Sequence, residues 1–277
     1  LVLNEISGGT ELPAWLNEGL ATYLEYELGL QGVRPNAARR ELYRSVDAAR
    51  SSVVSGPFLP LTGLESQSRW MAQTDDAIIR LMYAEAHMAV RLLTEDHGAD
   101  APVRVMLELA EGGSLQDALQ TVTGRSYLQF RDRFASWLQI WEDPARAAIA
   151  QYARELDDIL AAESAIFARR SAYLDSGLPI EQSKSLSARL VADSRDLQVR
   201  LRGLVPGESL TSLHDDATEF LASLVNMLTL EHDYLESGIE SKRIEAGKMI
   251  SELFGRVFRL QRDLSTVQFN YQLKPAG

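Results

Sequence analysis

The sequence of 277 residues contains no cysteine, so disulfide bonds and thiolate metal sites are both excluded. It also has no run of eighteen or more apolar residues, which a membrane-spanning helix requires. Positive charge is scarce, because 28 lysines and arginines face 39 acidic residues, and the net charge is −11. That balance argues against nucleic-acid binding, for which a basic face is expected.

What the chain does contain is helical periodicity, with no convincing alternation of the kind that predicts strands. We therefore expect an all-α fold, and 45% hydrophobic residues are enough for one large or two smaller domains. A boundary is expected at Glu142-Asp143-Pro144, because proline suits the first turn of a new helix. The predicted domains are residues 1–143 and 144–277.

Region 1–143 is predicted to consist of helices joined by loops. Asp75 or Asp76 and Ser114 are expected to cap two of these helices, and Gly98 and Gly124 are expected to end them. The expected helices span residues 13–28, 36–50, 77–97, 102–110, 114–122 and 127–141, with a loop at 55–64. In region 144–277, four long amphipathic helices with short connections predict an antiparallel four-helix bundle.

The helix predicted over residues 13–28 carries an unusual glutamate. Its apolar residues form one stripe: Leu16, Leu20, Tyr23, Leu24 and Leu28. Glu18 lies about 160° from the centre of that stripe, at about 100° per residue, where a glutamate is ordinarily solvated. Gly19 beside it costs about 1 kcal/mol relative to alanine, which indicates close approach by another backbone or by a ligand.

The segment AWLNEGLATYLEY, residues 14–26, resembles the segment that carries the third zinc ligand in gluzincin zinc metallopeptidases. The likeness is greatest to their aminopeptidases and to the peptidase MA-like bacterial families. The matching residues are Trp15, Asn17, Glu18, Gly19, Ala21, Tyr23 and Glu25. The resemblance implies that Glu18 binds zinc, that Asn17 and Gly19 contact substrate or support the site, and that the substrate is a peptide or protein.

A second segment, YAEAHMAVRLLTEDHGADAPVRVMLEL at residues 83–109, resembles the downstream helix of the same families. In those aminopeptidases a tyrosine at this place donates a hydrogen bond to the oxyanion of the tetrahedral intermediate, which implies that role for Tyr83. His87 follows one turn later and either lines the same cleft or is simply packed. The resemblance covers residues 1–141, as the helical half of a gluzincin-like catalytic domain.

The sequence departs from these families in one large respect. A gluzincin needs HExxH, whose two histidines bind zinc and whose glutamate activates the water. None of the four histidines here is four positions from another, so zinc is expected to bind only with an HExxH motif outside these residues. The segment LVLNEISGGTELPAW has the shape of a helix end, a loop and a new helix, so we expect the chain to be cut just downstream of that motif.

The alternative is a natural pseudoenzyme, a non-catalytic interaction protein that binds a protein partner through its helical bundle. Relatives of the peptidase MA-like type are often exported or membrane-tethered, which the resemblance implies for this chain as well.

Overall fold

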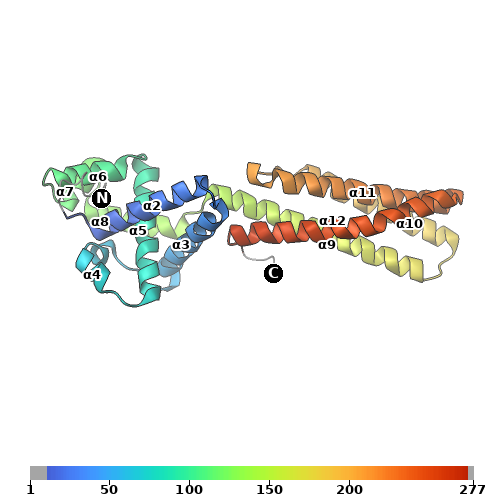
Figure 1. Ribbon diagram of the computed structural model, residues 1–277, viewed down its shortest axis with the longest axis horizontal. Coiled ribbons are helices and arrows are strands. Elements are labelled where there is room, and N and C mark those ends of the chain that lie inside the picture. The colour runs from blue at the N-terminus through green and yellow to red at the C-terminus, as the bar shows by residue number, and fades with distance from the viewer. Residues whose placement is uncertain (1–10, 274–277) are drawn as a thin grey trace. The chain divides into compact units, whose positions relative to one another are not determined.

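The computed structural model describes residues 11–273, and every regular element in that range is a helix (Figure 1). The expectation of an all-α fold is therefore confirmed. The chain divides into two compact units, Leu1–Glu142 and Asp143–Gly277. The helix end and the Gly8-Gly9 loop expected near the start lie outside the described residues.

The first unit contains seven α-helices and one 3-10 helix among its described residues. They are α2 (Ala14–Gln31), α3 (Pro35–Ser55), η1 (Leu61–Leu64), α4 (Gln67–Ala72), α5 (Asp76–His97), α6 (Ala101–Ala110), α7 (Leu115–Thr123) and α8 (Tyr127–Ile140). Helix α5 is central, because α2, α3, α6, α7 and α8 all contact it. From Ala84 to Val90 every residue of α5 is buried, so this helix forms the middle of the core.

Side-chain caps fix several helix starts at the expected places. The Asp75 carboxylate accepts hydrogen bonds from the amides of Ala77 and Ile78, and the Ser114 hydroxyl accepts one from Asp117. Ser126 and Gln129 form a reciprocal capping box at the start of α8. Gly98 and Gly124 follow the ends of α5 and α7 with positive φ, a conformation that favours glycine.

The predicted stripe of the first helix is wrong in its second half. Leu24 and Leu28 are 45% and 66% exposed, whereas Trp15, Leu16 and Leu20 are buried. Helix α2 also continues through Gly29 to Gln31, and Gly29 gives α3 room to approach. A Cβ there would lie 2.7 Å from the Cβ of Ala38. The helix therefore buries only its first half fully.

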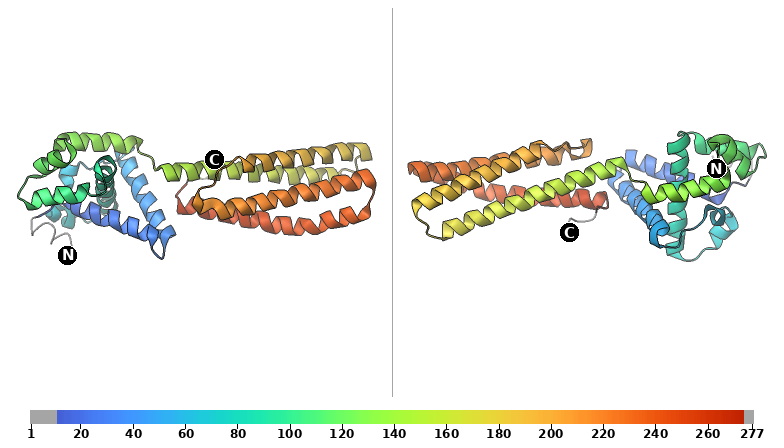
Figure 2. Two further views of the ribbon diagram at one scale, coloured as in Figure 1. Left: turned by 90° about the horizontal axis from the view of Figure 1, so that it is seen from above. Right: turned by 180° about the vertical axis from the view of Figure 1, so that it is seen from behind.

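In the described part of the second unit, four long helices lie side by side (Figure 2). They are α9 (Pro144–Asp175), α10 (Ile180–Arg202), α11 (Thr211–Ser237) and α12 (Glu240–Asn270), with a 3-10 helix, η2 (Glu208–Leu210), before α11. Helix α10 contacts α9 and α11, and α12 contacts α11 and α9. The core includes Leu156, Leu160, Leu197, Leu201, Phe220, Leu224, Leu228, Leu253 and Leu260.

The second unit contains a nearly buried ion pair and one buried glutamate. Arg170 of α9 donates to both carboxylate oxygens of Glu231 on α11, with a distance of 2.8 Å from Nε to Oε2. Glu163 of α9 is 1% exposed, and its Oε1 has no hydrogen-bond partner among the described residues. Burial raises the pKa of Glu163 from 4.5 to about 7.

None of the described helices combines the length and the apolar character needed to cross a membrane.

Candidate functional site

The segment around Glu18 is held where α2 begins. The amide of Ala14 donates a hydrogen bond to the carbonyl of Glu65, 2.8 Å away, and so ties the first turn of α2 to the loop before α4. The Trp15 ring is fully buried and stacks on Phe130 of α8, with 6.1 Å between ring centroids. These contacts fix the first turn of α2, which Glu18 directly follows.

The Glu18 carboxylate is half-buried and accepts hydrogen bonds from two side-chain amides. The Nδ2 of Asn17 and the Nε2 of Gln67 each lie 3.3 Å from its Oε1. Both bonds are long for N–H···O, whose usual range is about 2.7–3.2 Å. Both reach the same oxygen, so Oε2 is the oxygen that these amides leave available for a further donor or a cation.

Gly19 is the point at which α2 approaches α5 most closely. A Cβ at this position would lie 2.4 Å from the carbonyl oxygen of Ala86 and 2.9 Å from Cγ2 of Val90. No real Cβ tolerates such a contact with backbone, so the absence of a side chain is what allows this crossing. The expectation of close approach is met by another backbone.

Tyr83 lies on α5, one turn before Ala86, and is 37% exposed. Its ring meets the edge of Trp70 on α4 in a T-shaped contact, with centroids 5.1 Å apart. This arrangement suits the ring quadrupoles and fixes the direction of the tyrosine ring.

Helix α4 connects the two residues that the resemblance singled out. It carries Gln67 and Trp70 three positions apart, which places both on one face of the helix. Gln67 contacts Glu18, and Trp70 contacts Tyr83. The structure therefore brings Glu18 and Tyr83 to the same short helix, although 65 positions separate them in the sequence.

His87 has a different environment from Tyr83, although only one turn separates them. It is 1% exposed, and its ring packs edge-on against Tyr26 of α2 with centroids 5.0 Å apart. Its Nδ1 lies 3.5 Å from the Ser45 hydroxyl of α3. Burial, with a smaller effect from Arg91, lowers the pKa of His87 from 6.5 to about 3, so the ring is neutral at physiological pH. Its contacts are those of a packed residue between α2, α3 and α5.

His97 lies in the last turn of α5, where a helix C-terminus favours positive charge. Its surroundings act in the opposite direction. Partial burial lowers the pKa of His97, and Arg125 and Arg104 lower it further against the opposing effect of Asp96. The imidazole therefore favours its neutral form.

Three residues near the site were not anticipated from the sequence: Gln67, Trp70 and Glu85. Glu85 on α5 is fully buried and accepts hydrogen bonds from the Ser52 hydroxyl at 2.6 Å and the Leu59 amide at 3.1 Å. It fastens the loop after α3 to the central helix. A glutamate among apolar residues in YAEAHMAV was the available signal, because a charge is rarely left in a buried stretch without partners.

The described residues do not form a complete zinc site. Within residues 11–273, no group of three or more histidine, aspartate or glutamate side chains is arranged to hold a metal ion. A catalytic zinc needs three protein ligands and an open position, and Glu18 provides one carboxylate.

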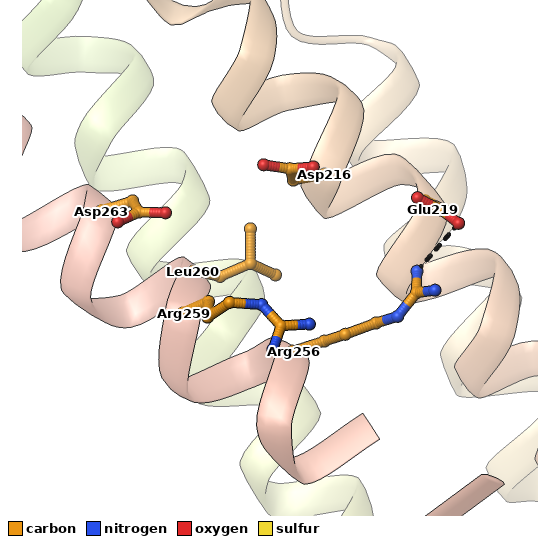
Figure 3. A pocket seen from close by; sticks show the side chains of 6 residues that line it. All are labelled: Asp216, Glu219, Arg256, Arg259, Leu260 and Asp263. Atoms are coloured by element: carbon orange, nitrogen blue, oxygen red, sulfur yellow. Dashed lines mark ion pairs between the residues drawn. The ribbon is translucent and has the colours of Figure 1, made fainter. Parts of the chain in front are cut away.

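A second candidate lies on the surface of the other unit, between α11 and α12 (Figure 3). This pocket of about 190 Å³ is lined by Asp216, Glu219, Arg256, Arg259, Leu260 and Asp263. Its charges largely neutralise one another, because Arg256 pairs with Glu219 at 3.1 Å and with Glu252 at 2.8 Å. No single charge dominates the lining, so the pocket does not indicate a particular ligand.

Comparisons with protein families, with curated proteins and with solved structures found no match for this chain. The functional inference therefore depends on the motif around Glu18 and on the arrangement of α2, α4 and α5.

Proposed function

We propose that the chain is the helical part of a zinc-dependent metallopeptidase of the gluzincin type, in which Glu18 is a metal ligand and Tyr83 a catalytic hydrogen-bond donor. The observation that carries the proposal is the contact of both residues with α4, through Gln67 and Trp70. In this proposal the second unit is an antiparallel four-helix bundle attached to the catalytic part.

The residues of this chain would act in two ways. Glu18 would offer a carboxylate oxygen to the metal while the amides of Asn17 and Gln67 orient its other oxygen, as outer hydrogen bonds commonly do for metal ligands. Tyr83 would donate its hydroxyl proton in a hydrogen bond to the developing oxyanion of a peptide substrate. What zinc supplies in such a site is activation of a water molecule. Its other two ligands, a pair of histidines, would have to come from outside these 277 residues.

The first experiment is to read the coding sequence before the codon for Leu1. An HExxH motif within about ten codons supports the proposal, because this spacing would let the two histidines and Glu18 meet at one metal. Absence of such a motif overturns it.

In the protein that includes the motif, peptidase activity on a quenched fluorescent peptide is measured together with metal content. Glu18→Gln should remove the bound zinc and the activity. Tyr83→Phe should retain the zinc and lower kcat by about 10²–10³-fold, as loss of one oxyanion donor does. Unchanged activity in both variants contradicts the assignment, and Tyr234→Phe, which alters a tyrosine on α11 of the second unit, is the control.

A second candidate function is protein–protein interaction through the C-terminal unit, without catalysis. The specific observation that favours it is exposed apolar surface on α12, where Phe258 is 68% exposed and Ile244 48%. If the chain acts by protein–protein interaction, Glu18→Gln should leave binding of the partner unchanged. The peptidase proposal predicts that the same change removes peptidase activity.

A further inference from the structure

One outward-facing line of residues on α12 has an order that the packing of the chain does not explain. The residues are Glu240, Ile244, Gly247, Ser251, Gly255, Phe258 and Arg262, here called the α12 stripe, and the same side of the helix continues to Ser265 and Phe269. At about 100° per residue they fall within an arc of about 80°. The buried residues of the helix, among them Leu253, Val257 and Leu260, lie on the opposite side.

The two glycines of the stripe are not explained by contacts inside the chain. A Cβ at Gly247 would meet nothing within 4 Å, and one at Gly255 would meet only the Arg259 guanidinium at 3.7 Å. Each glycine costs about 1 kcal/mol relative to alanine inside a helix. Gly19 shows the usual compensation, which is close approach by another helix. No helix of the described chain approaches Gly247 or Gly255 in this way.

The α12 stripe is symmetric about Ser251. Four residues to either side is a glycine, and seven residues to either side is a large exposed apolar residue, Ile244 or Phe258. Eleven residues to either side are opposite charges, Glu240 and Arg262. When two copies of a helix run antiparallel around a two-fold axis, residues equally distant from the axis lie at the same level. An axis at Ser251 therefore sets Gly247 level with Gly255 of the other copy, and Ile244 level with Phe258.

We propose that the α12 stripe is a homodimer interface, formed by antiparallel pairing with the α12 stripe of a second copy around a two-fold axis at Ser251. The opposite charges of Glu240 and Arg262 favour a second copy of α12 as the partner, in the antiparallel direction. Antiparallel pairing sets Glu240 level with Arg262 of the other copy, whereas parallel pairing would set each charge beside its like. In a single chain Glu240 bonds Arg243 and Arg262 bonds Asp263, and all four side chains are at least 42% exposed, so exchanging partners costs little.

The dimensions suit a helix pair of modest affinity. The α12 stripe spans 22 residue steps, which is about 33 Å at 1.5 Å per residue. Glycine and serine at its centre let the two helix axes approach closely, and the larger apolar residues fill the space on either side. A face of this length resembles the smaller class of specific interfaces, for which micromolar dissociation constants are common.

The absence of cysteine allows a direct test of the register on the full chain. In the proposed dimer the two copies of residue 251 are adjacent, so Ser251→Cys should form a disulfide-linked dimer under mild oxidation. Ser265 is also exposed on this side of α12, but its two copies would lie about 42 Å apart, far beyond the roughly 7 Å that a disulfide spans. Ser265→Cys is therefore the matched control, and we expect it to cross-link at least tenfold more slowly.

Sedimentation equilibrium of charge variants tests the same register without cross-linking. Glu240→Arg and Arg262→Glu should each raise the dimer dissociation constant by roughly five- to tenfold, because each creates two like-charge pairs. The double variant restores opposite charges and should return to within about twofold of the original value. Val199→Glu, an exposed apolar residue on α10, should leave the constant unchanged.

Three results would overturn the proposal. The first is a chain that remains monomeric at about 100 μM, well above a micromolar dissociation constant. The second is equal cross-linking of the two cysteine variants, which would indicate parallel or non-specific contact. The third is a double charge variant as weak as the single variants, which would mean that Glu240 and Arg262 do not meet across the interface.

Discussion

At Gly19, a single methyl group would lie 2.4 Å from the carbonyl oxygen of Ala86. The neighbouring helix cannot relieve this contact by rotating a side chain, because the obstructing atom belongs to its backbone. The size of residue 19 therefore sets the distance between α2 and α5. The same distance determines where Glu18 stands relative to Tyr83.

We predict that Gly19→Ala destabilises the first unit by about 2 kcal/mol, which is an overpacking cost of about 3 kcal/mol less a gain of about 1 kcal/mol in helix propensity. Urea denaturation measures the change in the free energy of unfolding. Gly63→Ala is the matched control in the same unit, because its nearest neighbour would be Cγ of Pro60 at 3.9 Å, an ordinary contact. The control should change stability by less than about 0.5 kcal/mol. Equal effects at the two positions would show that the close approach does not exist.

Glu85 makes the stability of the first unit depend on pH. Burial, against the opposing effects of the Ser52 and Leu59 hydrogen bonds, raises its pKa from 4.5 to about 7. The folded state therefore binds this proton more tightly than the unfolded state, so the contribution of Glu85 to stability is greatest below about pH 4.5 and is lost as pH rises to about 7. The contribution at stake is at most about 3 kcal/mol, at 1.36 kcal/mol per pH unit.

The measurement is urea denaturation of the protein and of Glu85→Gln from pH 4.5 to 7.5. Glutamine keeps a carbonyl acceptor but cannot ionise, so the stability of the variant relative to the original should rise across this range. Glu111→Gln, which makes the same change at an exposed position at the end of α6, is the matched control. A constant difference for Glu85→Gln would mean that Glu85 does not titrate in this range.

Helix α4 and η1 show which elements the sequence could not predict. Both lie in or beside a segment rich in proline, glycine and serine, and six and four residues are too few to establish a helical period. The longer helices could be predicted because their period repeats several times and because Asp75, Ser114 and the glycines after α5 and α7 mark their ends. The candidate site was predicted as two separate motifs, and the residues that join them, Gln67 and Trp70, were missed along with α4.

The exposed half of α2 has a similar explanation. Leu24 and Leu28 continue the period of Leu16 and Leu20, so the sequence alone predicts one continuous buried stripe. Burial depends on a partner, and α5 crosses α2 near Gly19 rather than lying along its full length. A periodic pattern therefore identifies a helix reliably, but not how much of its face another element covers.

Removing one partner of the ion pair between α9 and α11 should lower the free energy of unfolding far more than replacing both partners with apolar residues. The Arg170 and Glu231 side chains are 11% and 12% exposed, so removing one partner leaves the other charged in a poorly solvated place. Glu231→Ala should lower the free energy of unfolding of the second unit by about 3–5 kcal/mol. The double variant Arg170→Met with Glu231→Leu should recover most of this loss. A double variant as unstable as the single variant would show that the pair itself supplies the stability.

At the scale of the whole molecule, each unit has a core of its own. Each has a contiguous set of buried apolar side chains, centred on α5 in one and on the facing sides of α9 to α12 in the other. The boundary is marked by local chemistry as well. Asp143 accepts hydrogen bonds from the amides of Ala145 and Arg146, and Pro144 occupies the first turn of α9. The second unit therefore begins with a complete helix start.

We predict that residues 143–277 fold without the rest of the chain. Arg146 supports this, because its guanidinium donates to the carbonyls of Tyr271 and Gln272 at 2.9 and 2.6 Å and so joins the first turn of α9 to the end of α12. The isolated segment should show helical circular dichroism and one cooperative urea transition. Glu231→Ala should lower its stability as much as it lowers that of the second unit in the full chain, while Gly19→Ala in the full chain should leave that transition unchanged. The prediction is wrong if the isolated segment lacks a cooperative transition, or if Gly19→Ala shifts the transition of the second unit in the full chain. Either result would mean that the two units unfold as one cooperative unit.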